Sequence, residues 1–208
     1  MYHFFITIIS GLFKLLNGRP LIQGLENIPK DDSVIFAATH RSATDPFYLA
    51  INLKDRTIAF MAKESIFKFK PLAALLKSAH VFPVNRDKPS TKVIKHSVKL
   101  LADGLDLGIF PTGSRYSTEV KGGTAFIQTL SHKAIIPVSI QPPSNFWQFI
   151  SRRKARIAFG PAIPYIEGKK YKKADLAAID QQIAEEFDRL DKLNNPDYKY
   201  IPKKKKTM

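Results

Sequence analysis

The sequence predicts an α/β fold in which a central, mostly parallel sheet is flanked by helices. Short apolar, β-prone runs alternate along the chain with segments of helical spacing, as in sheets whose parallel strands are joined by helices. Residues 33–39 (SVIFAAT) are almost wholly apolar, as expected of a strand buried on both faces. The 208 residues, 44% of them hydrophobic, are enough for one substantial core.

The N-terminal stretch MYHFFITIISGLFKLL is the longest strongly apolar run in the chain. A membrane span needs about 20 apolar residues, and this run is shorter and carries Lys14. We expect residues 1–17 to form an amphipathic, membrane-associating helix that lies in the interface and is retained in the mature chain. The alternative is a first helix of the core.

The remaining elements follow in alternation. Asp45 is expected to be the N-cap of the second helix, with Pro46 in its first turn. Pro137 lies inside an apolar run and predicts an edge or bulged strand position. The expected strands are 33–39, 57–62, 81–84, 107–110, 134–140 and 155–159, and the expected helices begin at Asp45, Pro71, Lys88, Thr124 and near Leu176.

Charge and composition narrow the function. Lys and Arg number 33 against 18 Asp and Glu, so the formal charge of +15 attracts polyanions, whether nucleic acid, an acidic carrier protein or an anionic lipid surface. No nucleic-acid-binding motif is present, so we expect no nucleic-acid partner. The absence of cysteine excludes a disulfide framework, a thiolate nucleophile and cysteine-liganded zinc.

His40 and Asp45 are the first candidates for chemistry. The imidazole follows a predicted strand, the carboxylate begins the next helix, and four residues separate them. If Asp45 accepts a hydrogen bond from one ring nitrogen, the other nitrogen becomes a base for a substrate hydroxyl. The carboxylate then stabilises the imidazolium. The alternative is structural, with Asp45 capping its helix and His40 a polar residue at a strand end.

Three cations that each follow a predicted strand indicate an anion site beside this pair. Residues 107–123 (LGIFPTGSRYSTEVKGG) form a strand and a Gly-rich turn that leads to Arg115. The glycine spacing is that of a nucleotide-binding P-loop, but the required Lys is missing and Pro111 lacks an N–H, so nucleotide binding is rejected. The planar guanidinium suits a phosphate monoester. Arg86 and Lys63 follow two other strands, although each alone could be a solvated surface residue.

Four ordered blocks resemble those of the lysophosphatidic acid acyltransferase family, the 1-acylglycerol-3-phosphate acyltransferases. GLENIP, a strand and THRSATDP are similar to the first block, in which four residues separate a His from an Asp. VFPVNRD resembles the second block, IFPTGSRYS with KGG the third, and IIPVSI the fourth. By this resemblance His40 and Asp45 are catalytic, Arg115 binds the acceptor's phosphate, and Arg86 and Lys63 support that site.

The supporting turn departs from the family pattern. Thr112 stands where the third block usually has Glu, and Ser114 where it usually has Thr, while Gly113 matches. The missing carboxylate leaves the acceptor open, so another lysolipid is an alternative. A lipid hydrolase or thioesterase, in which His40 activates water, is a further one.

The resemblance implies transfer of a fatty acyl group from acyl-CoA or acyl carrier protein to the sn-2 hydroxyl of lysophosphatidic acid, which gives phosphatidic acid in phospholipid biosynthesis. No metal and no cofactor other than this donor substrate is expected. Residues 18–194 are then a glycerolipid acyltransferase domain, preceded by the membrane-interface segment 1–17 and followed by a basic tail, 195–208. We expect a peripheral protein on the cytoplasmic face of the cell membrane, held by an anionic surface.

Overall fold

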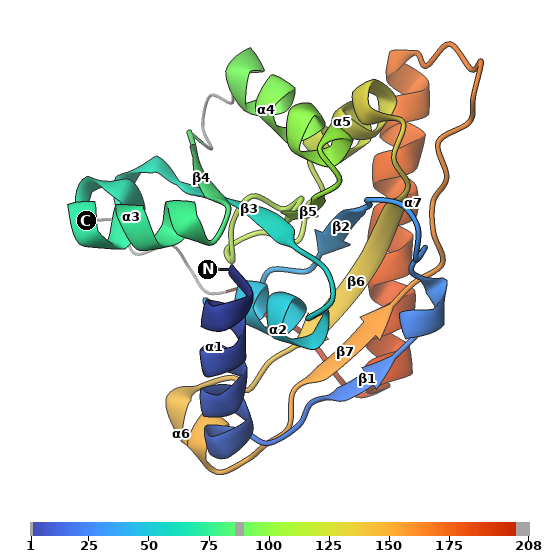
Figure 1. Ribbon diagram of the computed structural model, residues 1–208. Coiled ribbons are helices and arrows are strands. Elements are labelled where there is room, and N and C mark those ends of the chain that lie inside the picture. The colour runs from blue at the N-terminus through green and yellow to red at the C-terminus, as the bar shows by residue number, and fades with distance from the viewer. Residues whose placement is uncertain (1, 86–89, 203–208) are drawn as a thin grey trace.

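In the computed structural model the strands form one seven-stranded sheet (Figure 1). The structure describes residues 2–85 and 90–202. The sheet order is β1-β7-β6-β2-β5-β3-β4. Strands β6, β2, β5, β3 and β4 are parallel, and β7 pairs antiparallel with β6 and parallel with β1. The strands are β1 (Leu21–Gln23), β2 (Ile35–Ala38), β3 (Ile58–Lys63), β4 (Val81–Val84), β5 (Asp106–Ile109), β6 (Ile135–Gln141) and β7 (Arg156–Phe159).

Helices cover both faces of the sheet, so the α/β class is confirmed (Figure 1). Helices α1 and α2 pack on one face, and α4, α5 and α7 pack on the other. The helices are α1 (Tyr2–Leu16), α2 (Asp45–Asn52), α3 (Lys70–Ser78), α4 (Thr91–Ala102), α5 (Gly123–Ser131), α6 (Phe146–Ile150) and α7 (Lys173–Asn194), with short 3₁₀ turns η1 (Leu25–Asn27) and η2 (Glu64–Lys68). None of the helices in the described ranges has the length and apolar character needed to cross a bilayer.

Strand β2 lies at the centre of the core, as its apolar sequence predicts. Val34, Phe36 and Ala38 pack on the α1 and α2 face, whereas Ile35 and Ala37 pack on the opposite face. All five side chains are fully buried. A strand that is apolar at every position suits a parallel sheet that is covered by helices on both faces. Because β2 is buried in this way, the position of its C-terminal end is fixed by the core.

Of the two alternatives expected for Pro137, the edge position is not observed, because β6 is an interior strand between β2 and β7. The pairing on the β7 side is nevertheless interrupted beside Pro137. The pairs Val138–Phe159 and Ile135–Ile163 flank it, and the partner segment carries one more residue than β6 between them. Proline is tolerated here because its missing N–H faces this interruption. Two elements were not predicted, the short β1 and α6.

Gly24 permits the close approach of η1 to the end of β7. Its φ is 77°, and a Cβ atom at this position would lie 2.1 Å from the carbonyl oxygen of Phe159. Gly18 has a similar φ of 83° but open space around it. The two glycines therefore share the backbone requirement, and only Gly24 adds a steric one.

We predict that Gly24→Ala lowers the free energy of unfolding by more than about 1 kcal/mol, because a strained φ and a backbone clash add together. Gly18→Ala serves as the control and should lose less, since only the φ strain applies. Urea unfolding of the two variants and the parent measures the difference. Equal losses would contradict the proposed clash with Phe159.

Candidate active site

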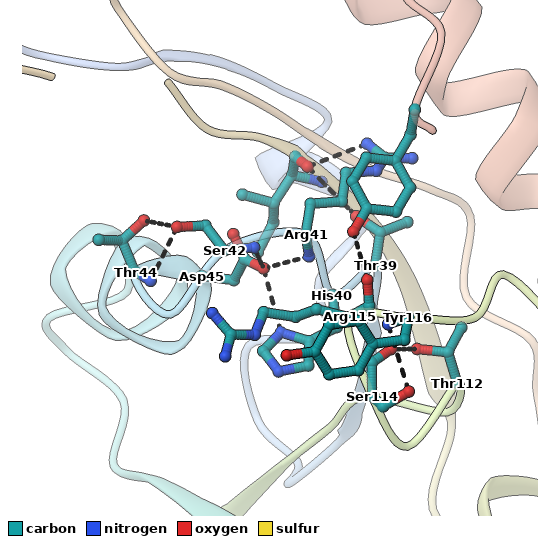
Figure 2. Close-up of polar contacts among 12 residues, drawn as sticks. Thr39, His40, Arg41, Ser42, Thr44, Asp45, Thr112, Ser114, Arg115 and Tyr116 are labelled. Atoms are coloured by element: carbon teal, nitrogen blue, oxygen red, sulfur yellow. Dashed lines mark hydrogen bonds and ion pairs between the residues drawn. The ribbon is translucent and has the colours of Figure 1, made fainter. Parts of the chain in front are cut away.

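The carboxylate of Asp45 faces back toward the end of β2 and gathers three donors (Figure 2). Its Oδ2 lies 3.1 Å from Nδ1 of His40 and accepts backbone N–H bonds from Arg41 at 2.6 Å and Ser42 at 2.7 Å. The expected contact between His40 and Asp45 is therefore present. The expected N-cap role of Asp45 is wrong, because the cap is Thr44 and the carboxylate is directed to the preceding turn instead.

This geometry determines which ring nitrogen of His40 carries the proton. The Asp45 side chain is fully buried, and its Oδ2 is the acceptor for two backbone N–H groups. A carboxylate can only accept, so the ring nitrogen that faces it, Nδ1 of His40, carries a proton. The other nitrogen, Nε2, keeps its lone pair and can take a proton from a hydroxyl group.

Aromatic packing holds the His40 ring from the β5 side. The ring centroids of His40 and Phe110 are 4.4 Å apart, and Phe110 stacks in turn on Phe60 at 6.4 Å. A Cβ atom on Gly108 would lie 2.3 Å from the Phe60 ring, so the glycine makes room for this stack. The sequence contained no periodic signal for this support, because the three rings come from three different segments, those of β2, β5 and β3, which become neighbours only in the sheet.

The turn after β5 has the conformation that its glycine predicts. Gly113 has a φ of 67°, and its N–H donates to the carbonyl of Phe110 at 2.9 Å. Thr112, which replaces the family's usual Glu, is buried, and its hydroxyl donates to the carbonyl of Ser114 at 3.0 Å. The Ser114 hydroxyl accepts from the N–H of Tyr116. Both substitutions thus stabilise the turn that carries Arg115.

Arg115 opens onto a cavity of about 370 Å³ that is rich in positive charge, and we call it the cationic cavity. None of the described residues that line it is an Asp or a Glu. It adjoins a second cavity, of about 510 Å³, that is lined by His40 and Thr112. The cationic side chains of the first cavity are Arg41, Arg115, Arg153, Lys154, Arg156 and Lys199. A phosphorylated ligand matches this lining.

Arg41 joins the turn after β2 to three other parts of the chain. Its guanidinium makes a two-pronged ion pair with Asp191 of α7 and donates to the carbonyl of Ile140 at 3.0 Å. The rings of Tyr198 and Tyr200 pack against it at 4.9 and 5.4 Å. The positive charge of Arg41 is therefore largely balanced by Asp191, so the neighbouring cations of the cavity are the ones available to a ligand.

The segment after α7 crosses the site rather than leaving it. Tyr198 and Tyr200 line the cavity that contains His40, and the Tyr200 hydroxyl donates to the carbonyl of Arg115 at 2.6 Å. Burial raises the pKa of both tyrosines, so their hydroxyls stay protonated at neutral pH. Sequence reasoning missed these residues and Asp191, because nothing in their local sequence links them to His40.

One predicted site residue is not placed beside His40, and another lies outside the described residues. Lys63 ends β3, two strands away from β2, and pairs in register with Val84. Arg86 lies outside the described residues, as does the run Lys203 to Lys206. Within the described ranges, no cluster of His, Asp and Glu side chains is arranged to hold a metal ion.

The fold and this arrangement define a class of protein: an α/β protein whose carboxylate-oriented histidine lies at the C-terminal edge of a parallel sheet, near the cationic cavity. Ligands of open α/β sheets bind at this edge. A family model described as Acyltransferase matches residues 19–141. The chain therefore belongs to the acyltransferase family, and the family expected from the four sequence blocks is confirmed.

Relatives support this membership along almost the whole chain. A protein of Streptococcus pneumoniae named 1-acyl-sn-glycerol-3-phosphate acyltransferase is 33% identical and aligns with 90% of this chain and 73% of its own length. A protein of Bacillus subtilis with the same name is 30% identical and covers 93% of this chain and 100% of its own. The crystal structure of the LPA acyltransferase PlsC from Thermotoga maritima has the same fold, with a TM-score of 0.69 at 20% identity over 91% of this chain and 79% of that one.

We predict that Arg41→Lys lowers the free energy of unfolding by about 1–3 kcal/mol, because a lysine cannot satisfy both oxygens of the partly buried Asp191. Arg189→Lys is the matched control, since its pair with Glu186 is exposed and adjacent on one helix. It should change stability by less than about 0.5 kcal/mol. Urea unfolding measures both variants, and a loss as small for Arg41 as for Arg189 would refute the anchoring role.

Proposed function

We propose that this chain transfers a fatty acyl group from an acyl thioester to the sn-2 hydroxyl of 1-acylglycerol 3-phosphate, which forms phosphatidic acid. The observation that carries the proposal is the buried contact of His40 with Asp45, which leaves Nε2 as a base next to the cationic cavity. The relatives' names supply the acceptor. Acyl-CoA and acyl carrier protein are the donors proposed.

In the proposed reaction the thioester is attacked directly. Nε2 of His40 takes the proton of the lysolipid hydroxyl as its oxygen attacks the thioester carbonyl carbon. The carbon–sulfur bond then breaks, and the departing thiolate takes the proton from His40. Asp45 stabilises the imidazolium that exists between these two transfers. No protein nucleophile takes part, which agrees with a chain that has no cysteine and no G-x-S-x-G sequence.

The acceptor's phosphate is proposed to bind in the cationic cavity, with Arg115 as its main partner. An apolar groove of about 400 Å³ meets this cavity at Ser42, Pro143 and Ser144. Leu12 and Phe47 are among the apolar side chains that line the groove. Phosphate at one end and hydrocarbon at the other are the two parts of a lysophosphatidic acid, so the pair of cavities suits such a ligand. Lys63 and Arg86 remain proposed supporting residues.

Helix α1 is proposed to hold the enzyme peripherally on the cytoplasmic face of the cell membrane. Its outer stripe of Phe4, Ile8, Leu12 and Leu15 is between 51% and 68% exposed. Residues three or four positions apart share one face of a helix, so the stripe forms one apolar surface. The net charge of +15 adds attraction to an anionic leaflet.

We predict that His40→Ala lowers kcat at least about 10²-fold, the low end for loss of a general base. Asp45→Asn should also lower kcat strongly, because its amide can still accept from the backbone but cannot stabilise the imidazolium. Phosphatidic acid formation from lysophosphatidic acid and each donor type is the measurement. Near-normal turnover by His40→Ala, or thioester cleavage that proceeds equally without an acceptor, would reject the mechanism.

We predict that Arg115→Gln lowers kcat/KM for lysophosphatidic acid about 10- to 100-fold, the range for a lost hydrogen bond to a charged group. Turnover of a monoacylglycerol, which lacks the phosphate, should be unaffected by the change. Lys170→Gln is the control, because it removes an exposed cation that does not line the cationic cavity. Equal effects of Arg115→Gln on both acceptors would argue against phosphate binding there.

A further inference from the structure

Helix α6 presents the most exposed aromatic pair on the α1 side of the molecule. The side chains of Phe146 and Trp147 are 67% and 74% exposed. Exposing two adjacent large aromatic side chains to water is unfavourable, and contiguous exposed apolar surface is typical of sites that contact a partner or a membrane. Tryptophan and phenylalanine followed closely by cations are typical of segments that lie at the interface between membrane and water. Here Arg152, Arg153 and Lys154 follow the helix and are exposed.

Buried polar contacts fix α6 to the end of α1. The Asn17 amide is fully buried and donates to the carbonyls of Phe149 at 3.0 Å and Arg153 at 2.9 Å. Its own carbonyl accepts from the Tyr48 hydroxyl at 2.6 Å, which adds α2 to the cluster. The Arg152 guanidinium donates to the carbonyl of Leu15 at 3.1 Å. Helix α6 is therefore held in a defined place relative to α1.

The exposed faces of α1 and α6 border one surface. Leu12 of the α1 stripe and Phe146 of α6 line the same apolar groove, which reaches Ser42, two residues from His40. The exposed cations at the ends of these two helices are Lys14 in the last turn of α1, Arg19 just after it, and the three that follow α6. An apolar centre with a positive margin is complementary to a bilayer that carries anionic headgroups.

We propose that α6 is a second membrane-contacting element, which inserts Phe146 and Trp147 into the interface of an anionic bilayer while Arg152, Arg153 and Lys154 meet lipid headgroups. This proposal rests on the peripheral location proposed for α1 and names a further part of the docking surface. With both helices in the interface, the groove between them opens toward the lipid, so that an acceptor reaches His40 from the membrane side.

Trp147 is the single tryptophan of the chain, so its fluorescence reports on α6 alone. The full-length protein is titrated with vesicles of phosphatidylcholine, with and without phosphatidylglycerol. We expect the emission to shift to shorter wavelength with the anionic vesicles, and brominated lipid chains to quench it. Protein that co-sediments with the vesicles without a spectral change would overturn the role of α6 and leave the α1 location intact. A shift that depends on protein concentration without lipid would assign the surface to self-association and overturn the proposal.

A pair of variants tests how much Trp147 contributes to the affinity for anionic vesicles. Trp147→Ser should weaken binding to anionic vesicles about tenfold, the effect expected for one large apolar side chain removed from a nonpolar environment. Phe126→Ser is the control, because Phe126 is 40% exposed on α5, which packs on the other face of the sheet. Activity of Trp147→Ser should fall with lysophosphatidic acid in vesicles and stay unchanged with a short-chain acceptor below its micellar concentration. Equal vesicle binding by both variants would refute the proposal.

Discussion

One oxygen atom, Oδ2 of Asp45, organises the site. It lies within hydrogen-bonding distance of Nδ1 of His40 and of the backbone nitrogens of Arg41 and Ser42, so it closes the turn between β2 and α2 around a buried negative charge. Burying a carboxylate is costly unless donors meet it, and the three donors of this site all meet Oδ2. The same requirement that stabilises this charge orients the imidazole, and loop structure and chemistry therefore depend on one interaction.

Arg41 stabilises the same turn through contacts of both its backbone and its side chain. Its backbone N–H holds Asp45, while its side chain pairs with Asp191 of α7 and lies against Tyr198 and Tyr200. Because the Tyr200 hydroxyl also donates to the carbonyl of Arg115, the segment after α7 links the turn that carries His40 to the proposed phosphate site. The two halves of the site are thus held at a fixed separation by residues near the C-terminal end of the described chain.

An apolar surface and a cationic surface also lie next to each other in this molecule, as an amphiphilic ligand would require. Helices α1, α2 and α6 surround an apolar groove, and the cationic cavity begins where that groove ends, at Ser42. Asn17 binds these three helices together through buried hydrogen bonds. A ligand with a hydrocarbon chain at one end and a phosphate at the other matches this order of apolar and cationic surfaces.

The sequence by itself determined the α/β class, most strands and helices, and the His40 and Asp45 pair, because these follow from local patterns: apolar runs, helical spacing and a short fixed separation. Only the tertiary structure decided the surroundings of that pair. Pro137 lies in an interior strand, where its missing N–H is tolerated because the pairing with the partner strand is interrupted beside it. Asp191 reaches Arg41 across 150 positions of sequence. Such contacts depend on how sheet, helix and terminal segment pack together, and no local pattern encodes them.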